Sequence, residues 1–100
     1  MTRIGAATLI LSFVLVLGSA ASLAQELPPG AAACSGCHPA SRWVATPVPR
    51  LNARPAGDIV TAMQDFRTGK RTATVMDKIA KGFPDSEINS IAAWYAARKE

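Results

Sequence analysis

Two cysteines and a histidine lie within five consecutive residues of this chain, Cys34-Ser35-Gly36-Cys37-His38, and they are the only Cys and His in the sequence. Thiols separated by two residues can lie on one side of a helical turn, where they can add to the vinyl groups at one porphyrin edge. A histidine directly after the second thiol then lies under the iron as an axial ligand. The pattern therefore predicts covalent haem attachment, with Cys34 and Cys37 as thioether positions and His38 as the proximal ligand.

Other chemistry for this motif is less well supported. A zinc site takes about four Cys, His or carboxylate ligands, and the chain has no Cys or His outside the motif. A thioredoxin-like redox pair needs a strand–helix–strand context, and no strand pattern lies near Cys34. A redox pair of this kind, or a plain structural disulfide, remains the alternative to haem.

Residues 1–24 resemble a cleaved secretory signal. Arg3 gives the positive start, residues 4–17 are uncharged and mostly apolar, and residues 22–24 (Ser-Leu-Ala) fit the small-x-small cleavage rule. The alternative is an uncleaved anchor, but the apolar run is shorter than the ~20 residues that span a bilayer. We expect cleavage before Gln25, a periplasmic location and no stable membrane span afterwards.

Residues 25–100 are expected to form one small domain. The whole chain has a net charge of +4, from 11 Lys and Arg against 7 Asp and Glu. Arg3 lies in the expected leader, so the mature chain keeps only a modest positive charge, and nucleic acid is not an expected partner. Side chains alone rarely stabilise so small a domain. A covalent haem would give its helices a large apolar body to pack against.

The hydrophobic spacing predicts an all-α fold of three to five helices wrapped around one haem. Ile59, Met63 and Phe66 fall on one face of a helix, and Ile91 and Tyr95 do so in the last helix. No segment alternates with period two over a useful length. The expected elements are a brief helix from about residue 29 into the haem motif, an irregular proline-rich loop over 39–57, and helices over 58–67, 76–81 and 84–98.

Two methionines could supply the second axial ligand after the leader is removed, Met63 and Met76. Met is the common partner of His in electron-carrying c-type haems. Met63 is aligned with the apolar face of its helix, where a Met usually belongs to the core. Met76 follows a polar loop over 71–75 that could cross the other haem face. We predict Met76 as the distal ligand, with an open or differently ligated iron as the alternative.

The order of these features resembles the class I cytochromes c. The haem motif is followed by Pro49-x-Leu51, a helix, Met76 and a C-terminal helix with two adjacent aromatics, and the resemblance covers residues 30–98. Residues 65–71 and 74–83 are similar to the haem subunit of flavocytochrome c sulfide dehydrogenases and to cytochrome c4/c553-like carriers.

This resemblance implies a role for Pro49, whose carbonyl would accept a hydrogen bond from the proximal imidazole and so fix its tautomer. It repeats the ligand roles given above to His38 and Met76. It also implies that the aromatic pair Trp94-Tyr95 lies where the last helix crosses the first.

The chain departs from the family pattern after Pro49. The family often has Pro-x-Leu-x-Gly-Gln, whereas Ala53 and Arg54 occupy the last two of these positions here. The stretch after the haem motif, residues 39–43, also lacks the usual Gly-rich turn.

The residues outside the haem motif form no catalytic constellation, since there is no second His and no motif pairs two carboxylates. We therefore expect transfer of single electrons and assign no catalytic residue. By the resemblance the donor is a flavoprotein subunit that oxidises sulfide, the acceptor is a downstream cytochrome or oxidase, and this chain is the non-catalytic haem subunit. The alternatives are a freely diffusing carrier between respiratory or photosynthetic complexes and, third, a haem enzyme or gas sensor with labile Met76.

Cations gather in two stretches of the mature chain. They either form an ordinary solvated surface or surround the exposed haem edge and steer acidic partners. Trp43, in the first stretch, either docks a partner or covers the haem. The cations are Arg42, Arg50 and Arg54 in the proline-rich loop and Lys70, Arg71, Lys78 and Lys81 on either side of Met76.

Overall fold

The computed structural model describes residues 26–99, together with Thr2 and Gly5. The leader expected over 1–24 lies almost wholly outside the described residues, so its cleavage stays a prediction.

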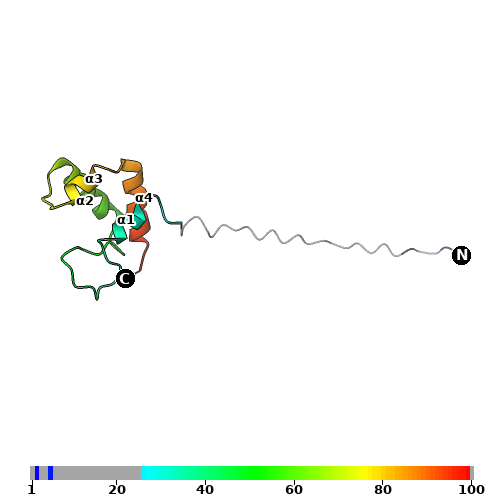
Figure 1. The fold of residues 1–100 in the computed structure, drawn as a ribbon. Coiled ribbons are helices and arrows are strands. Elements are labelled where there is room, and N and C mark those ends of the chain that lie inside the picture. Colours follow the sequence, from blue (N-terminus) through cyan, green and yellow to red (C-terminus); the bar gives the residue numbers. More distant parts are fainter. Residues whose placement is uncertain (1, 3–4, 6–25, 100) are drawn as a thin grey trace.

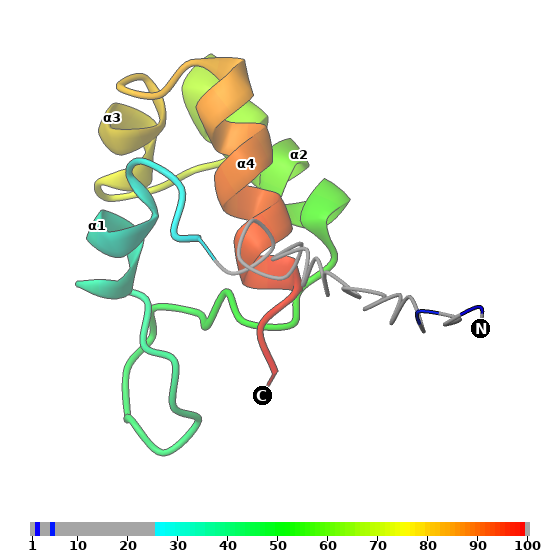
Figure 2. The ribbon, with the colours of Figure 1, turned by 90° about the vertical axis from the view of Figure 1, so that its right-hand side faces the viewer.

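The described residues form four helices and no strand, which confirms the expected all-α class. Helix α2 packs against both α3 and α4, and α1 and α3 lie on the same side of α4 (Figure 1, Figure 2). The helices are α1 (Ala31–Ser35), α2 (Ala56–Thr68), α3 (Met76–Ala80) and α4 (Asp85–Ala96).

Two helix ends differ from the expected ones. α2 begins two residues earlier than expected because Pro55, with a φ of −54°, sets up the first turn, and its carbonyl accepts from the N–H of Asp58 at 3.0 Å. α4 ends earlier than expected because the N–H of Arg98 bonds to the carbonyl of Tyr95 at 3.0 Å, a tighter turn than the α-helix allows. The Arg98 side chain also donates to the carbonyl of Trp94 at 3.2 Å.

The core lies where α1 crosses α4. Gly30, just before α1, has a φ of +84°, and a Cβ at this position would lie 2.6 Å from the Phe83 ring and 3.3 Å from Ile91. Only glycine meets both conditions, so the chain can pass directly over α4 here. The core cluster is made of Ala31, Ile59, Ile91, Ala92 and Tyr95. The predicted crossing of the first helix by the Trp94-Tyr95 end of α4 is thus present.

Arg67 fixes the end of α2 to the start of α4. Its guanidinium donates to the carboxylate of Asp85 at 2.6 Å and to the carbonyl of Phe83 at 2.7 Å. Gly69 then ends α2 with a φ of +79°, as the sequence predicts.

The chain between α1 and α2 has no helix or strand, as expected for a proline-rich loop. It projects away from the helices (Figure 1), and Trp43 within it is 88% exposed. Across residues 26–99 no helix has the length and apolar character needed to span a bilayer.

Candidate haem-binding site

The haem motif occupies the end of α1 and the turn after it. The carbonyl of Cys34 accepts from the N–H groups of both Cys37, at 3.2 Å, and His38, at 2.9 Å. The backbone therefore keeps a helical path as far as His38. Both thiols are free, and Cys34 is half-buried while Cys37 is exposed. Burial raises the pKa of the Cys34 thiol. The motif thus presents two thiols and one imidazole from a single short turn.

The His38 ring is held by Pro49. Nδ1 of His38 lies 2.5 Å from the carbonyl oxygen of Pro49. A carbonyl oxygen can only accept, so Nδ1 carries the proton and Nε2 keeps the lone pair that a metal needs. The contact that the resemblance implies for Pro49 is present, and it leaves the imidazole in the tautomer suited to an iron ligand.

Met76 is the first residue of α3, the short helix expected at this point, and its side chain is half-buried. On either side of it, Val75 and Ile79 are apolar yet 54% and 42% exposed. Met63 is also half-buried and lies in α2 with the core residue Ile59. The choice of Met76 over Met63 stays a prediction.

A haem fits the groups that this domain presents. The donor set consists of two thiols and an imidazole with its Nε2 available, and thioether attachment requires this set. Among the described residues no large side chain is fully buried, and the core contains mostly small or branched residues. The domain also leaves apolar side chains exposed at its surface, among them Leu27, Val44, Val75 and Ile79. Of these, Val75 and Ile79 lie next to Met76 in the chain, where a large flat apolar group held by that residue would cover them.

One residue of this region has a role that the sequence did not reveal. The hydroxyl of Tyr95 donates to the carbonyl of Ala31 at 2.5 Å, and the carbonyl of Tyr95 accepts from the N–H of Ala53 at 3.0 Å. Burial raises the pKa of Tyr95, which keeps the hydroxyl in its donating form. Ala53 has a φ of +63°, in the region that favours glycine. The sequence could have indicated this left-handed conformation, because the family usually has glycine where this chain has Ala53.

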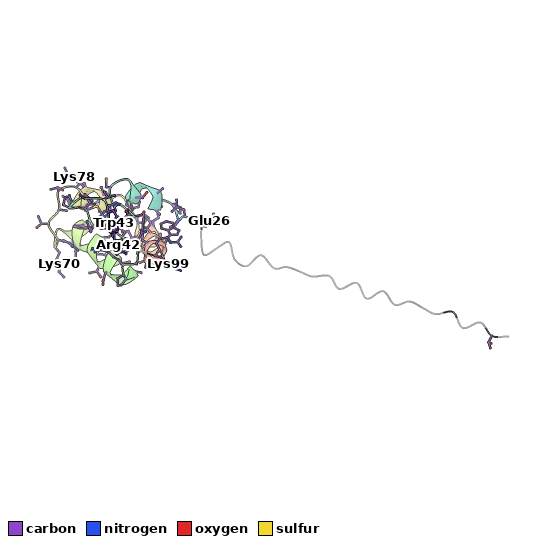
Figure 3. All side chains as sticks on the ribbon, turned by 90° about the horizontal axis from the view of Figure 1, so that it is seen from below. Glu26, Arg42, Trp43, Lys70, Lys78 and Lys99 are labelled. Carbon is purple, nitrogen blue, oxygen red and sulfur yellow. The ribbon has the colours of Figure 1, made fainter. Side chains whose placement is uncertain are left out.

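The cations lie on different sides of the domain. Lys70 and Lys78 lie at one edge in Figure 3, Lys99 lies toward the opposite edge, and Arg42 lies beside Trp43. Arg71 places its guanidinium 5.2 Å from the centre of the Phe66 ring. Lys70 and Lys78, from the stretch around Met76, thus lie apart from Lys99 in this view.

The curated relatives of this chain are cytochromes and an electron acceptor. The cytochrome subunit of sulfide dehydrogenase from Chlorobaculum tepidum is 37% identical over 62% of this chain and 56% of its own length. The thiosulfate dehydrogenase electron acceptor of Stutzerimonas stutzeri is 37% identical over 65% of this chain and 31% of its own. Cytochrome c4 of Pseudomonas aeruginosa is 31% identical over 91% of this chain and 48% of its own.

The chain thus spans about half the length, or less, of the curated relatives it matches. No protein-family model and no solved structure matches it.

An all-α domain whose first helix ends in a Cys-x-x-Cys-His turn, with the imidazole held by a proline carbonyl, has the fold and site of a small c-type cytochrome. Its relatives are class I c-type cytochromes, and the chain is related to them along most of its length. The cofactor is haem c, and Cys34 and Cys37 have the spacing that its covalent attachment uses.

Proposed function

We propose that this chain is a periplasmic single-electron carrier. The observation that carries this proposal is the contact between Nδ1 of His38 and the carbonyl of Pro49, directly after the two cysteines. When bound, the haem supplies an iron that alternates between Fe(III) and Fe(II). The chain holds that iron with His38 and Met76 and attaches the ring through Cys34 and Cys37. A His and Met ligand pair raises the reduction potential.

A redox titration of the mature protein tests this function. Absorbance followed against applied potential should give one reversible one-electron transition. The absence of a reversible transition in protein that carries haem would contradict the proposal.

The domain limits belong to the same proposal. Residues 1–24 act as a cleaved leader that sends the chain to the periplasm, and residues 25–100 form the haem domain. Mass spectrometry of protein matured in a host with a c-type maturation system should give the mass of residues 25–100 plus one haem. A retained leader would support the membrane anchor instead.

The electron donor that we propose is a flavoprotein subunit that oxidises sulfide. The support comes from the relative in Chlorobaculum tepidum, which is itself the cytochrome subunit of a sulfide dehydrogenase. This chain would then be the non-catalytic haem subunit, passing electrons to a downstream cytochrome or oxidase. Such a flavoprotein, given sulfide, should reduce this cytochrome rapidly.

The proline-rich loop is the surface that we expect to meet this donor. Residues 39–57 contain three arginines and no acidic residue, so they form a positively charged segment. Trp43 adds an exposed aromatic beside a shallow hollow of about 360 Å³. An acidic face on the flavoprotein complements this segment, and an interface of roughly 800 Å² per partner is an ordinary size.

Single charge reversals can identify the docking surface. Arg54 and Lys70 are both exposed and belong to different stretches of cations in the sequence, and reversal of either changes the net charge equally. Arg54→Glu should slow reduction by the flavoprotein, most at low salt, because rim charges act mainly on the association rate. Arg50→Glu should do the same, whereas Lys70→Glu should leave the rate nearly unchanged. Equal slowing by Arg54→Glu and Lys70→Glu would exclude the loop as the docking surface.

A freely diffusing carrier is the second candidate function, and the similarity to cytochrome c4 favours it. Purification as a monomer that no flavoprotein of the host reduces would support this candidate. A haem enzyme or gas sensor is the third possibility, and it requires an iron whose Met76 ligand leaves readily. Binding of carbon monoxide by the reduced wild-type protein would support that reading.

A further inference from the structure

Tyr95 makes hydrogen bonds through both its side-chain hydroxyl and its backbone carbonyl, and it is only 3% exposed. Its hydroxyl donates to the carbonyl of Ala31 at 2.5 Å. Its own carbonyl accepts from the N–H of Ala53 and from the N–H of Arg98, each at 3.0 Å. One residue of α4 therefore ties the first turn of α1 to the segment that follows Pro49.

The loop that joins His38 to Pro49 cannot place the Pro49 carbonyl by itself. Residues 39–48 contain no helix or strand, and Trp43 among them is 88% exposed. A chain segment of this kind keeps many conformations unless its ends are fixed from outside. Hydrogen bonds inside the loop, such as Val44 N–H to the Ser41 carbonyl and Val48 N–H to the Thr46 hydroxyl, are local turns, so contacts on either side of the loop are also needed to set the position of the Pro49 carbonyl. Besides Tyr95, those contacts include Leu51, which packs against the core cluster.

The hydrogen bond between Ala53 and Tyr95 holds the segment after Pro49 in an unusual backbone conformation. Its φ of +63° places a residue with a Cβ in the left-handed region, where L-residues are strained. The N–H of Arg54 also bonds to the carbonyl of Leu51, at 3.2 Å, which closes a tight turn. The hydrogen bond from Ala53 to Tyr95 holds this turn against the end of α4.

We propose that Tyr95 is a positioning residue for the proximal ligand, acting through Ala31 on one side and Ala53 on the other. This inference rests on the proposed haem site. By fixing α1 and the turn after Pro49 to one residue, Tyr95 keeps the Pro49 carbonyl against Nδ1 of His38. That hydrogen bond makes the imidazole a stronger electron donor, which favours Fe(III) and lowers the reduction potential.

The test compares Tyr95→Phe with Ile91→Val in the mature protein that carries its haem. Tyr95→Phe removes only the hydroxyl, and Ile91→Val removes one methylene from the same core cluster without touching a hydrogen bond. Two properties are measured: the midpoint potential, and the exchange rate of the His38 Nδ1 proton by NMR of the reduced protein. A general loss of stability would change these two properties alike in both variants, and Ile91→Val therefore serves as the control for it.

Tyr95→Phe should raise the exchange rate roughly fivefold, the factor that one net hydrogen bond corresponds to, and should raise the midpoint potential. Ile91→Val should change neither. Equal changes in both variants, or none in Tyr95→Phe, would overturn the positioning role and leave the proposed function standing. Wild-type protein without covalent haem would overturn the proposed function and this inference together.

Discussion

The two sides of the predicted haem site are built differently. We name α1, α4 and residues 49–54 the proximal frame, and residues 70–80 the distal segment. In the proximal frame, segments far apart in the sequence are joined by hydrogen bonds: His38 to Pro49, Tyr95 to Ala31, and Ala53 to Tyr95. Each of these bonds fixes the position of one backbone relative to another.

The distal segment is fixed mainly by short-range contacts with α2. The N–H of Arg71 bonds to the carbonyl of Asp65 at 3.1 Å, and the Arg71 side chain lies over Phe66. Ala80 is fully buried, while Val75 and Ile79 beside Met76 remain largely exposed. The protein chain itself therefore fixes the predicted proximal ligand, whereas on the distal side the predicted ligand Met76 lies among apolar groups that the haem would cover.

The largest effect should come from the distal segment. Met76→Ala should abolish the weak far-red absorption band that marks a sulfur ligand on Fe(III), and the reduced protein should then bind carbon monoxide. The free energy of unfolding should fall as well, because loss of the sulfur ligand releases the distal segment from the iron and the substitution truncates a half-buried side chain. Absorption spectra with and without carbon monoxide measure this.

Met63→Leu is the matched control. It should keep the far-red band and lower the free energy of unfolding by about 1 kcal/mol or less, as a near-isosteric swap does. Loss of the band in Met63→Leu, with its retention in Met76→Ala, would show that the distal ligand comes from α2.

The next effect should come from the helix crossing in the proximal frame. Gly30→Ala adds a Cβ 2.6 Å from the Phe83 ring at a φ of +84°. We expect a loss of about 3 kcal/mol in the free energy of unfolding, from left-handed strain and from overpacking. Denaturant unfolding of the mature protein measures the loss.

Gly69→Ala separates the two causes. Its φ of +79° is nearly the same, but a Cβ there meets no atom within 4 Å. The strain alone should lower the free energy of unfolding by roughly 1 to 2 kcal/mol. If both glycine variants lose the same amount, the close approach of α1 to α4 contributes nothing.

A small gain is expected at Ala53. Ala53→Gly relieves left-handed strain worth roughly 1–2 kcal/mol, and the extra freedom of glycine in the unfolded chain offsets about half of it. The net stabilisation should be under about 1 kcal/mol by the same denaturant unfolding. A loss of stability would mean that the φ of +63° carries no strain.

The sequence predicted the helices well because their apolar spacing and end residues are local signals. Gly69 marks the end of α2 and the haem motif the end of α1, whereas Pro55, expected in the loop, begins α2 two residues before the predicted start. The contact of Pro49 with His38 was foreseen only through the family resemblance, since the two residues lie eleven positions apart with irregular chain between them. No spacing rule spans such a loop.

The part that could not be predicted depends on contacts distant in sequence. The hydroxyl of Tyr95 meets the carbonyl of Ala31 across 64 positions, and nothing local to either residue indicates it. Spacing placed Tyr95 correctly in the core, but the same spacing would place a Phe there equally well. Similarly, the strain at Ala53 was visible only as a departure from a family glycine.

Covalent attachment of the haem is the central claim, and one extraction tests it most directly. Protein matured in a host with a c-type maturation system is treated with acidified acetone, which removes haem held by coordination alone. We predict that the red colour stays with the polypeptide, and that a Cys34→Ala, Cys37→Ala double variant yields colourless protein or releases its haem. Release of free haem from the wild-type protein would contradict the account.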